Sequence, residues 1–315
     1  MAGSLGYRGY LRVTSSKYVL PLTGAQLSEN IAINESRSIH GGGVGTVDGR
    51  FASLHNYAIG QATYEGELRG DVFAGTGNYG NAFREILYRT IGQTPTDIST
   101  RDTGFNSTNQ LILSPGGGSE WIFPKTGGTN AKAVVSSMTL SAKVGGNVEF
   151  TAAVTSAGAG FNSTAANAPV VTDFAYEPGG TTDDSNPLPY YASAFTVTGS
   201  GETSMTERIT GWSININNNS VPIFTFDGNN YASDILQGMM EVSGSFEYYS
   251  PDGTFVRNLT HGASAALTFG ANTINLPHMA FGPYPVPLPG PNDPTIRTVQ
   301  FKAFASSSYP SIYLV

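Results

Sequence analysis

The 315-residue chain contains no cysteine, so neither a disulfide framework nor a thiolate metal site can hold it together. Only 12% of its residues are charged, whereas about a quarter is usual for a globular protein. Its 23 acidic residues outnumber its 16 basic ones and give a net charge of -7. Proteins that hold nucleic acid by neutralising phosphates need clustered Lys and Arg, so the composition excludes a general nucleic-acid binder.

Long apolar segments are also missing. No run approaches the roughly 18 apolar residues of a membrane-spanning helix, and residues 1–16 lack the apolar core of a signal peptide. We therefore expect no membrane partner, and a protein that is made and first kept in a cytoplasm.

Residues with the spacing of a catalytic or metal site are scarce. None of the four histidines has a second histidine or a carboxylate at metal-ligand spacing. No Gly-x-Ser-x-Gly segment marks a serine nucleophile, and a cysteine nucleophile is impossible. We expect no enzymatic activity, no bound metal and no cofactor.

What the sequence does contain is an internal repeat. Residues 56–73, NYAIGQATYEGELRGDVF, align without a gap with residues 230–247, NYASDILQGMMEVSGSFE. Both copies open with Asn-Tyr-Ala and close on a strand pattern of Glu, apolar, any, Gly, any, apolar. The residues that we expect to form this repeated core strand are Leu68, Gly70 and Val72 in the first copy and Val242, Gly244 and Phe246 in the second.

The first copy separates two faces, because successive side chains of a strand point to opposite sides. Leu68, Gly70 and Val72 face one way, whereas the other side carries Glu65, Glu67, Arg69 and Asp71. The central glycine predicts either a bulge or a chain that passes close by.

The segments after the two copies also repeat. Residues 81–92, NAFREILYRTIG, carry an apolar helical stripe between a capping Asn81 and Gly92. A weaker helical pattern over residues 254–261 repeats the spacing of two apolar positions. Each half then closes on the strand pattern Val-x-Phe-x-Ala, at Val148 and at Val299. Four elements recur in the same order, so we infer an internal duplication.

This order divides the chain into four parts. We expect an N-terminal arm over residues 1–18, a first β domain over 19–156, a linker over 157–170 and a second β domain over 171–315. The linker is rich in Ala, Gly, Ser, Thr and Asn, which is typical of a flexible connection. Basic and aromatic residues characterise the arm, which a frayed terminus would also explain: Tyr7, Arg8, Tyr10 and Arg12.

Residues 138–154 show the clearest alternation in the chain, with apolar or small residues at even positions. A two-residue turn at Gly145 and Gly146 would mix the two faces and is disfavoured. A single strand of about 55 Å and a hairpin with a three-residue turn from Gly145 to Asn147 both keep the faces pure. Either form can reach beyond its own domain.

Several segments resemble the tail tube proteins of long-tailed bacteriophages. They are residues 212–219 (WSININNN), 231–238 (YASDILQG), 241–246 (EVSGSF), 274–277 (INLP) and 299–303 (VQFKA). The resemblance covers about residues 205–305, and it is looser over 25–155, where it depends on the internal repeat. The Pro-rich run 283–294 and the glycine loop at 41–43 depart from the family's pattern.

The resemblance implies a mainly β fold of two tail-tube-type β-sandwich or barrel domains, each with one short flanking helix. It implies rings that stack into the hollow tail tube of a virion, assembled in the host cytoplasm, through which the genome passes. Six fold positions per ring and two folds per chain favour a ring of three chains with pseudo-sixfold symmetry over a ring of six. The implied partners are other copies of the chain, the tail tip and head-proximal tail proteins, and double-stranded DNA that slides past an acidic lumen without specific binding.

In such a tube, the arm and the long alternating segment suit contacts between rings, the latter through Met138, Leu140, Val144, Val148 and Phe150. We expect Glu65, Glu67 and Asp71 to face the lumen. Another β-rich virion protein, either a capsid decoration module or a receptor- or glycan-binding adhesin, is the alternative function. Tube formation would argue against that alternative, and glycan binding would argue for it.

Overall fold

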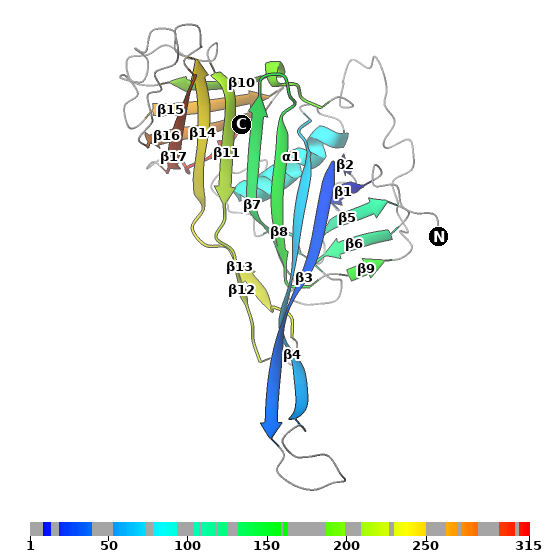
Figure 1. Cartoon of the computed structure of the whole chain (residues 1–315). Coiled ribbons are helices and arrows are strands. Elements are labelled where there is room, and N and C mark those ends of the chain that lie inside the picture. Colours follow the sequence, from blue (N-terminus) through cyan, green and yellow to red (C-terminus); the bar gives the residue numbers. More distant parts are fainter. Residues whose placement is uncertain are drawn as a thin grey trace.

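The computed structural model describes residues 9–13, 19–39, 53–73, 78–92, 104–106, 109–116, 119–124, 132–158, 160–162, 187–198, 209–226, 230–249, 263–269, 272–282, 296–305 and 309–315. Within these ranges the chain is mainly β, with one α-helix and one short 3-10 helix (Figure 1). The mainly β fold that the sequence predicts is thereby confirmed.

One large antiparallel sheet runs through both halves of the chain (Figure 1). Strands β7 and β11, one from each half, pair from Ser137 with Asn217 to Lys143 with Gly211 and make the sheet continuous. In spatial order the strands are β10 (Ser193–Thr198), β15 (Ala263–Phe269), β16 (Asn272–Phe281), β17 (Ile296–Phe304), β14 (Glu241–Tyr249), β11 (Ile209–Asn217), β7 (Ala133–Lys143), β8 (Glu149–Ser156), β4 (Ser53–Asp71) and β3 (Gly24–Ile39), with β18 (Tyr313–Leu314) beside β16.

A smaller sheet and a helix cover one face of the large sheet. Helix α1 (Asn78–Ile91) contacts β7 on one side and two strands of the smaller sheet on the other. The smaller sheet has the order β2 (Val19–Pro21), β1 (Tyr10–Val13), β5 (Leu111–Gly116), β6 (Ser119–Phe123) and β9 (Gly160–Asn162). Two further elements are η3 (Tyr190–Ala192) and a two-stranded arm of β12 (Val221–Ile223) and β13 (Asp234–Leu236).

Helix α1 follows from the apolar stripe that the sequence shows. Phe83, Ile86 and Leu87 are buried, and the helix ends at Gly92, whose positive φ of 76° lets its N–H reach the carbonyl of Tyr88. The ring of Phe83 lies 5.6 Å from that of Phe150 and 6.1 Å from that of Phe269. The helix therefore packs on both halves, which share one hydrophobic core. The second predicted helix, residues 254–261, lies outside the described residues.

Residues 138–154 form the β7–β8 hairpin and not a single strand of about 55 Å. Leu140 lies opposite Phe150 and Met138 opposite Ala152, so even-numbered residues face even-numbered residues. The hairpin alternative is thus the correct one, but its register differs by two residues from that of a turn at Gly145 to Asn147, which would place Leu140 opposite Ala152. Both registers keep the faces pure and let the two strands bury the same apolar face.

Two segments predicted as connections contain strands. β1 lies inside the predicted arm, and β9 lies inside the predicted linker, where it pairs with β6. Both belong to the smaller sheet, whose strands come from three separate regions of the chain. Local composition could not indicate this pairing.

The two halves share a register at the strands of the repeat. Gly70 on β4 lies opposite Phe150 on β8, and Gly244 on β14 lies opposite Phe301 on β17. A Cβ on either glycine would lie 2.7 Å or less from the facing phenylalanine ring, so the close approach predicted there is found at both sites. Leu68 and Val242 likewise face Ala152 and Ala303.

The gapless alignment of the repeat does not hold for its opening residues. The first copy opens within the continuous strand β4. The second opens between β12 and β13 of the two-stranded arm and enters β14 only at Glu241. Tyr231 of the second copy instead lies next to Ala62 of the first, in a parallel bridge. The correspondence is therefore one of strands and their register.

Candidate functional site

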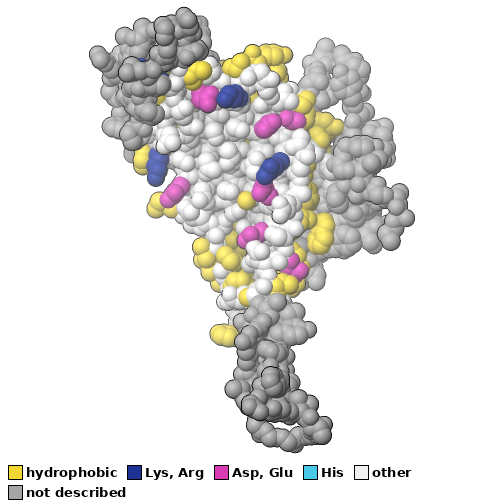
Figure 2. Space-filling view, viewed as in Figure 1, with side chains coloured by type: hydrophobic (Ala, Val, Ile, Leu, Met, Phe, Trp, Pro, Cys, Tyr) yellow, Lys and Arg dark blue, Asp and Glu magenta, His cyan; other side chains and the backbone are white. Residues whose placement is uncertain are grey.

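The large sheet has one buried face and one polar face (Figure 2). Along β17, for example, Val299 and Phe301 are buried, whereas Thr298, Gln300 and Lys302 are exposed. The register carries this alternation across β3, β4, β8, β7, β11, β14 and β17, with irregularities at Ile31–Ile33, Val135–Ser137 and Ile209–Gly211. We call this surface the polar face. Its uncharged members include Gln26, Ser28, Thr155, Thr151, Ser137, Thr139, Ser141, Ser213, Asn215, Asn217, Ser243, Ser245, Thr298 and Gln300.

Charged side chains on the polar face are sparse, and acids outnumber bases. Among the side chains that the structure describes on these strands, the basic members of the polar face are Arg69, Lys143 and Lys302. Twice as many are acidic: Glu65, Glu67, Asp71, Glu149, Glu241 and Glu247. The face is therefore hydrophilic with a small negative excess, which repels other anions.

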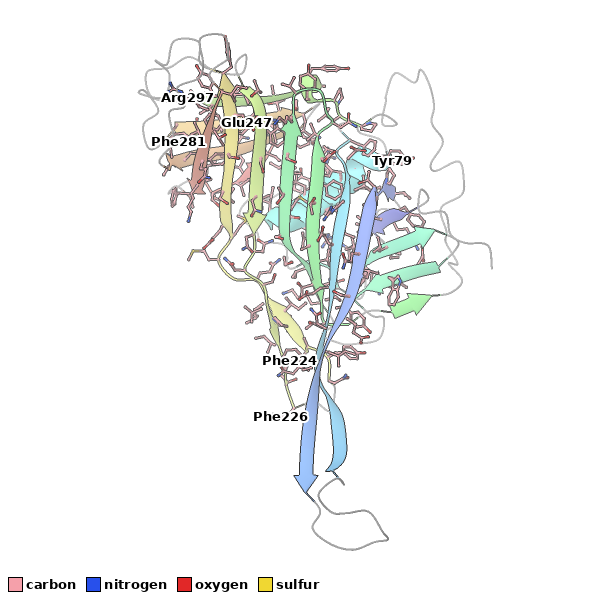
Figure 3. All side chains as sticks on the ribbon, in the orientation of Figure 1. Tyr79, Phe224, Phe226, Glu247, Phe281 and Arg297 are labelled. Atoms are coloured by element: carbon pink, nitrogen blue, oxygen red, sulfur yellow. The ribbon has the colours of Figure 1, made fainter. Side chains whose placement is uncertain are left out.

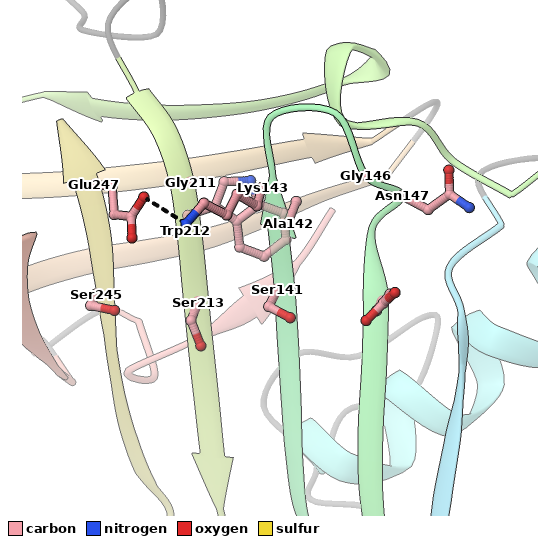
Figure 4. Close-up of a pocket in the computed structure, with 11 residues that line it drawn as sticks. Ser141, Ala142, Lys143, Gly146, Asn147, Gly211, Trp212, Ser213, Ser245 and Glu247 are labelled. Carbon is pink, nitrogen blue, oxygen red and sulfur yellow. Dashed lines mark ion pairs between the residues drawn. The ribbon is translucent and has the colours of Figure 1, made fainter. Parts of the chain in front are cut away.

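Ion pairs neutralise two of the three bases. Lys143 and Glu247 lie on strands that flank Gly211, and their charged atoms are 3.7 Å apart above that glycine (Figure 4). Arg69 donates to Glu67, two residues away on β4, at 2.6 Å. These exposed pairs contribute little to stability, but they leave the acidic side chains to set the sign of the surface.

The polar face is hollowed in two places. One hollow, of about 310 Å³, lies around the Lys143–Glu247 pair and is lined by Ser141, Ser213 and Ser245 (Figure 4). The other, of about 330 Å³, lies over β3, β4 and β8 beside Glu65 and Glu67. In the described part of the chain no group of three or more His, Asp or Glu is placed to hold a metal. Nor does any helix there have the length and apolar character to cross a membrane.

The sequence model of phage tail tube proteins matches residues 56–303. The chain belongs to the phage tail tube protein family. The matched region begins in β4 and ends in β17, so it spans six of the seven strands that carry the polar face. No curated protein matches the chain. Membership makes it a structural protein of the virion tail and favours this role over the decoration and adhesin alternatives.

The three acids predicted to face the tube lumen lie together on the polar face of this tail tube protein. Glu65, Glu67 and Asp71 all point away from the core on β4, and Asp71 accepts a hydrogen bond of 3.4 Å from Asn147. Of the residues of the repeated core strand, Leu68, Val72, Val242 and Phe246 lie in the core. The two glycines of that strand lie against the phenylalanine rings already described.

Most of the residues proposed for contacts between rings are buried within the chain itself. Met138, Leu140, Val148 and Phe150 are core residues, whereas Val144, at the turn of the hairpin, is 54% exposed. A role of the hairpin between rings stays a prediction, and Val144 is the side chain available for it.

Tyr10 and Arg12 are buried within the tail tube chain and do not belong to a free arm. Arg12 donates to both carboxylate oxygens of Glu120, at 2.9 and 3.1 Å, and Tyr10 donates to the same carboxylate at 2.9 Å. Burial, together with the hydrogen bond to Glu120, raises the pKa of Tyr10 to about 12. The other two predicted arm residues, Tyr7 and Arg8, lie outside the described residues.

Sequence reasoning missed a long edge that borders the polar face. β3 ends the strand order of the large sheet and has β4 as its one strand neighbour among the described residues. It spans 16 residues and contains no lysine or proline, which commonly protect sheet edges from pairing. Nothing in its own sequence marks it as an edge, because edge position depends on partners far along the chain.

Proposed function

We propose that copies of this chain join edge to edge into a closed ring, and that such rings stack into a tube whose lumen is lined by the polar face. The observation that carries this proposal is the pairing of β7 with β11, which already joins two halves into one sheet with one polar face. A hollow tube of the tail tube family needs that joint to be repeated around the ring.

The joint inside the chain supplies a pattern for the joint between chains. β3, β4, β8 and β7 of the first half correspond in register to β11, β14, β17 and β16 of the second. The last strand of the first half, β7, pairs with the first strand of the second, β11. By the same rule, β3 of the next copy pairs at the β16–β17 side, beyond the segment of β16 that already pairs with β15. We infer from this correspondence that the chain is an internal duplication, and three chains then complete six fold positions.

The β3–β4 hairpin supports contact between successive rings. Its two strands pair as far as Ile39 and Ser53, beyond the other strands of the large sheet (Figure 1). A two-stranded ribbon is only marginally stable alone in water, so a second copy that covers it would stabilise it.

Edge variants test the ring. Ala25 and Ile31 are exposed on β3, and the double variant Ala25→Lys with Ile31→Lys places two charges on the edge. We expect wild type at high concentration to form rings with six similar densities from three chains in negative-stain images, and the edge variant to remain monomeric. Thr151→Lys, in the middle of the polar face, is the control that should still assemble. Normal rings from the edge variant would contradict the joint.

Charge variants test the lumen. The triple change of Glu65, Glu67 and Asp71 to lysine should leave the joint intact but make assembled tubes retain double-stranded DNA, which wild-type tubes release. Glu65→Gln, Glu67→Gln and Asp71→Asn together remove charge without reversing it and should not retain DNA. Equal DNA retention by lysine and wild-type tubes would show that these residues lie outside the lumen.

A further inference from the structure

The arm of β12 and β13 presents a fully exposed aromatic side chain. Phe226 follows β12 and lies at the end of the arm away from β11 and β14 (Figure 3). Phe224, two residues earlier, instead packs against a small buried cluster that includes Val134 and Ile235. The two phenylalanines thus have opposite surroundings, and burial within this chain accounts for only one of them.

The arm is fixed to the body through Asn230 and Tyr231. The N–H of Ala62 on β4 donates to the carbonyl of Asn230 at 2.8 Å. The rings of Tyr64 and Tyr231 stack with centroids 5.7 Å apart, and the Tyr231 hydroxyl donates to Glu29 at 3.1 Å. An exposed aromatic ring on a fixed support is preorganised for contact, because little conformational entropy is lost on binding.

A second apolar surface lies at the opposite end of β11. There the turn of the β7–β8 hairpin meets η3, and a hollow is lined by Val144, Tyr190 and Ile209. Val144 is 54% exposed and Tyr191 is 77% exposed. The N–H of Val144 donates to Thr210, which holds the turn beside the start of β11.

The two surfaces face opposite directions along the strands. β11 begins at Ile209 beside the hollow and ends at Asn217, four residues before the arm begins at Val221 (Figure 1). A projecting ring at one end and the exposed Val144 and Tyr191 side chains at the other are different surfaces of the same chain. When two such surfaces meet between copies, the contact is heterologous and can repeat without closing.

We propose that Phe226 of one copy packs against Val144, Tyr190 and Tyr191 of a second copy in the next ring, and that this contact drives stacking. The inference rests on the proposed tube. A second copy is the occupant that fits, because the chain itself carries the complementary surface at the end that a stack brings into contact. Edge-to-face packing of Phe on Tyr suits such a site, since it buries apolar area while the tyrosine hydroxyls stay in water.

Cysteine pairs test the contact directly, because the chain has no cysteine of its own. Phe226→Cys with Val144→Cys should give a ladder of cross-linked copies after mild oxidation of assembled tubes, seen on a non-reducing gel. Phe226→Cys with Val315→Cys pairs the same site with an exposed side chain that belongs to neither proposed contact and should give no ladder. A ladder from the control pair equal to that from the test pair would overturn the inference.

A charge at Phe226 separates stacking from ring formation. Phe226→Asp should melt like wild type, because the side chain is exposed, and should still form single rings. Loss of one aromatic anchor should raise the concentration needed for tubes about 30-fold. Val315→Asp, at an exposed apolar side chain that belongs to neither proposed contact, is the matched control and should stack normally.

The outcomes distinguish the two proposals. Rings without tubes for Phe226→Asp, beside tubes for Val315→Asp, support the stacking contact. Tubes from Phe226→Asp at the wild-type concentration overturn this inference and leave the proposed function standing. Absence of both rings and tubes from wild type, under conditions in which the fold is intact, overturns the proposed function and this inference with it.

Discussion

Replacing Gly244 by alanine tests how closely β14 is packed between its neighbours. A Cβ at this position would lie 2.2 Å from the carbonyl oxygen of Ser213 on β11 and 2.5 Å from the Phe301 ring on β17. Gly70 has the matching place on β4, where a Cβ would lie 2.7 Å from the Phe150 ring and 3.3 Å from the nearest carbonyl oxygen. A phenylalanine ring can turn away, whereas a backbone carbonyl moves only with its strand.

These distances predict how the three glycine-to-alanine substitutions rank in their loss of unfolding free energy. The contact with Ser213 is about 1 Å shorter than an ordinary C···O contact, so β11 and β14 must separate locally. Overpacking of this kind costs about 1–3 kcal/mol and occasionally more, and we expect Gly244→Ala to lose about 3 kcal/mol of unfolding free energy. Gly70→Ala should lose about 1–2 kcal/mol. Gly24→Ala, whose Cβ would meet nothing closer than 4.0 Å, should lose none.

Urea unfolding followed by circular dichroism measures these differences, provided that the slope with denaturant is unchanged. A second substitution distinguishes the clash with a phenylalanine ring from the clash with a backbone carbonyl oxygen. Compared with Phe150→Leu alone, the further change Gly70→Ala should cost little, because the shorter side chain makes room. Compared with Phe301→Leu alone, Gly244→Ala should keep most of its cost, because the Ser213 carbonyl remains. A loss below about 1 kcal/mol for Gly244→Ala would refute the reasoning.

Three other predictions concern buried polar groups. Arg12→Ala leaves the Glu120 carboxylate buried without its cationic partner, with the Tyr10 hydroxyl still donating to it, and should cost about 3–5 kcal/mol in urea unfolding, whereas Arg12→Met with Glu120→Leu should cost less. Asn218→Ala removes two amide hydrogen bonds, of 2.7 and 2.9 Å, to carbonyls on α1 and β7; it should cost about 2–3 kcal/mol and lower the melting temperature. Because the pKa of Tyr10 is raised from 10.0 to about 12 in the folded chain, its contribution to stability is complete below pH 10 and is lost as the pH rises to about 12. Unfolding midpoints across this range should fall less for Tyr10→Phe, and an equal fall would refute this assignment.

The features that depend on side-chain period could be predicted from the sequence. The alternation of apolar and polar residues in β8, β14 and β17 predicted which side chains of each strand are buried. One side of each strand faces the core and the other faces water, so successive positions need opposite residue types. In residues 138–154 the apolar or small residues lie at even-numbered positions, and this pattern was enough to exclude a two-residue turn in the hairpin. The polar character around Glu65 was also visible, since it is a property of one strand.

The features that depend on pairing between distant strands could not be predicted. Arg12 and Tyr10 suggested an exposed arm because their partner, Glu120, lies more than 100 residues away in the sequence. The gapless alignment of the repeat gave no sign of a structural difference between its copies. The first copy lies within the continuous strand β4, whereas the second opens between β12 and β13. The polar face likewise exists only because β7 and β11 bring two halves into one sheet.

The proposed ring gives a physical reason for the low charge of the chain. A lumen for DNA needs a surface that holds water yet offers phosphates no strong partner, and serine, threonine, asparagine and glutamine meet both requirements. Here two of the three lysines and arginines of the polar face are already paired with glutamates. A modest acidic excess then suffices to keep DNA from binding, because the remaining interactions with phosphate are weak and readily exchanged with water.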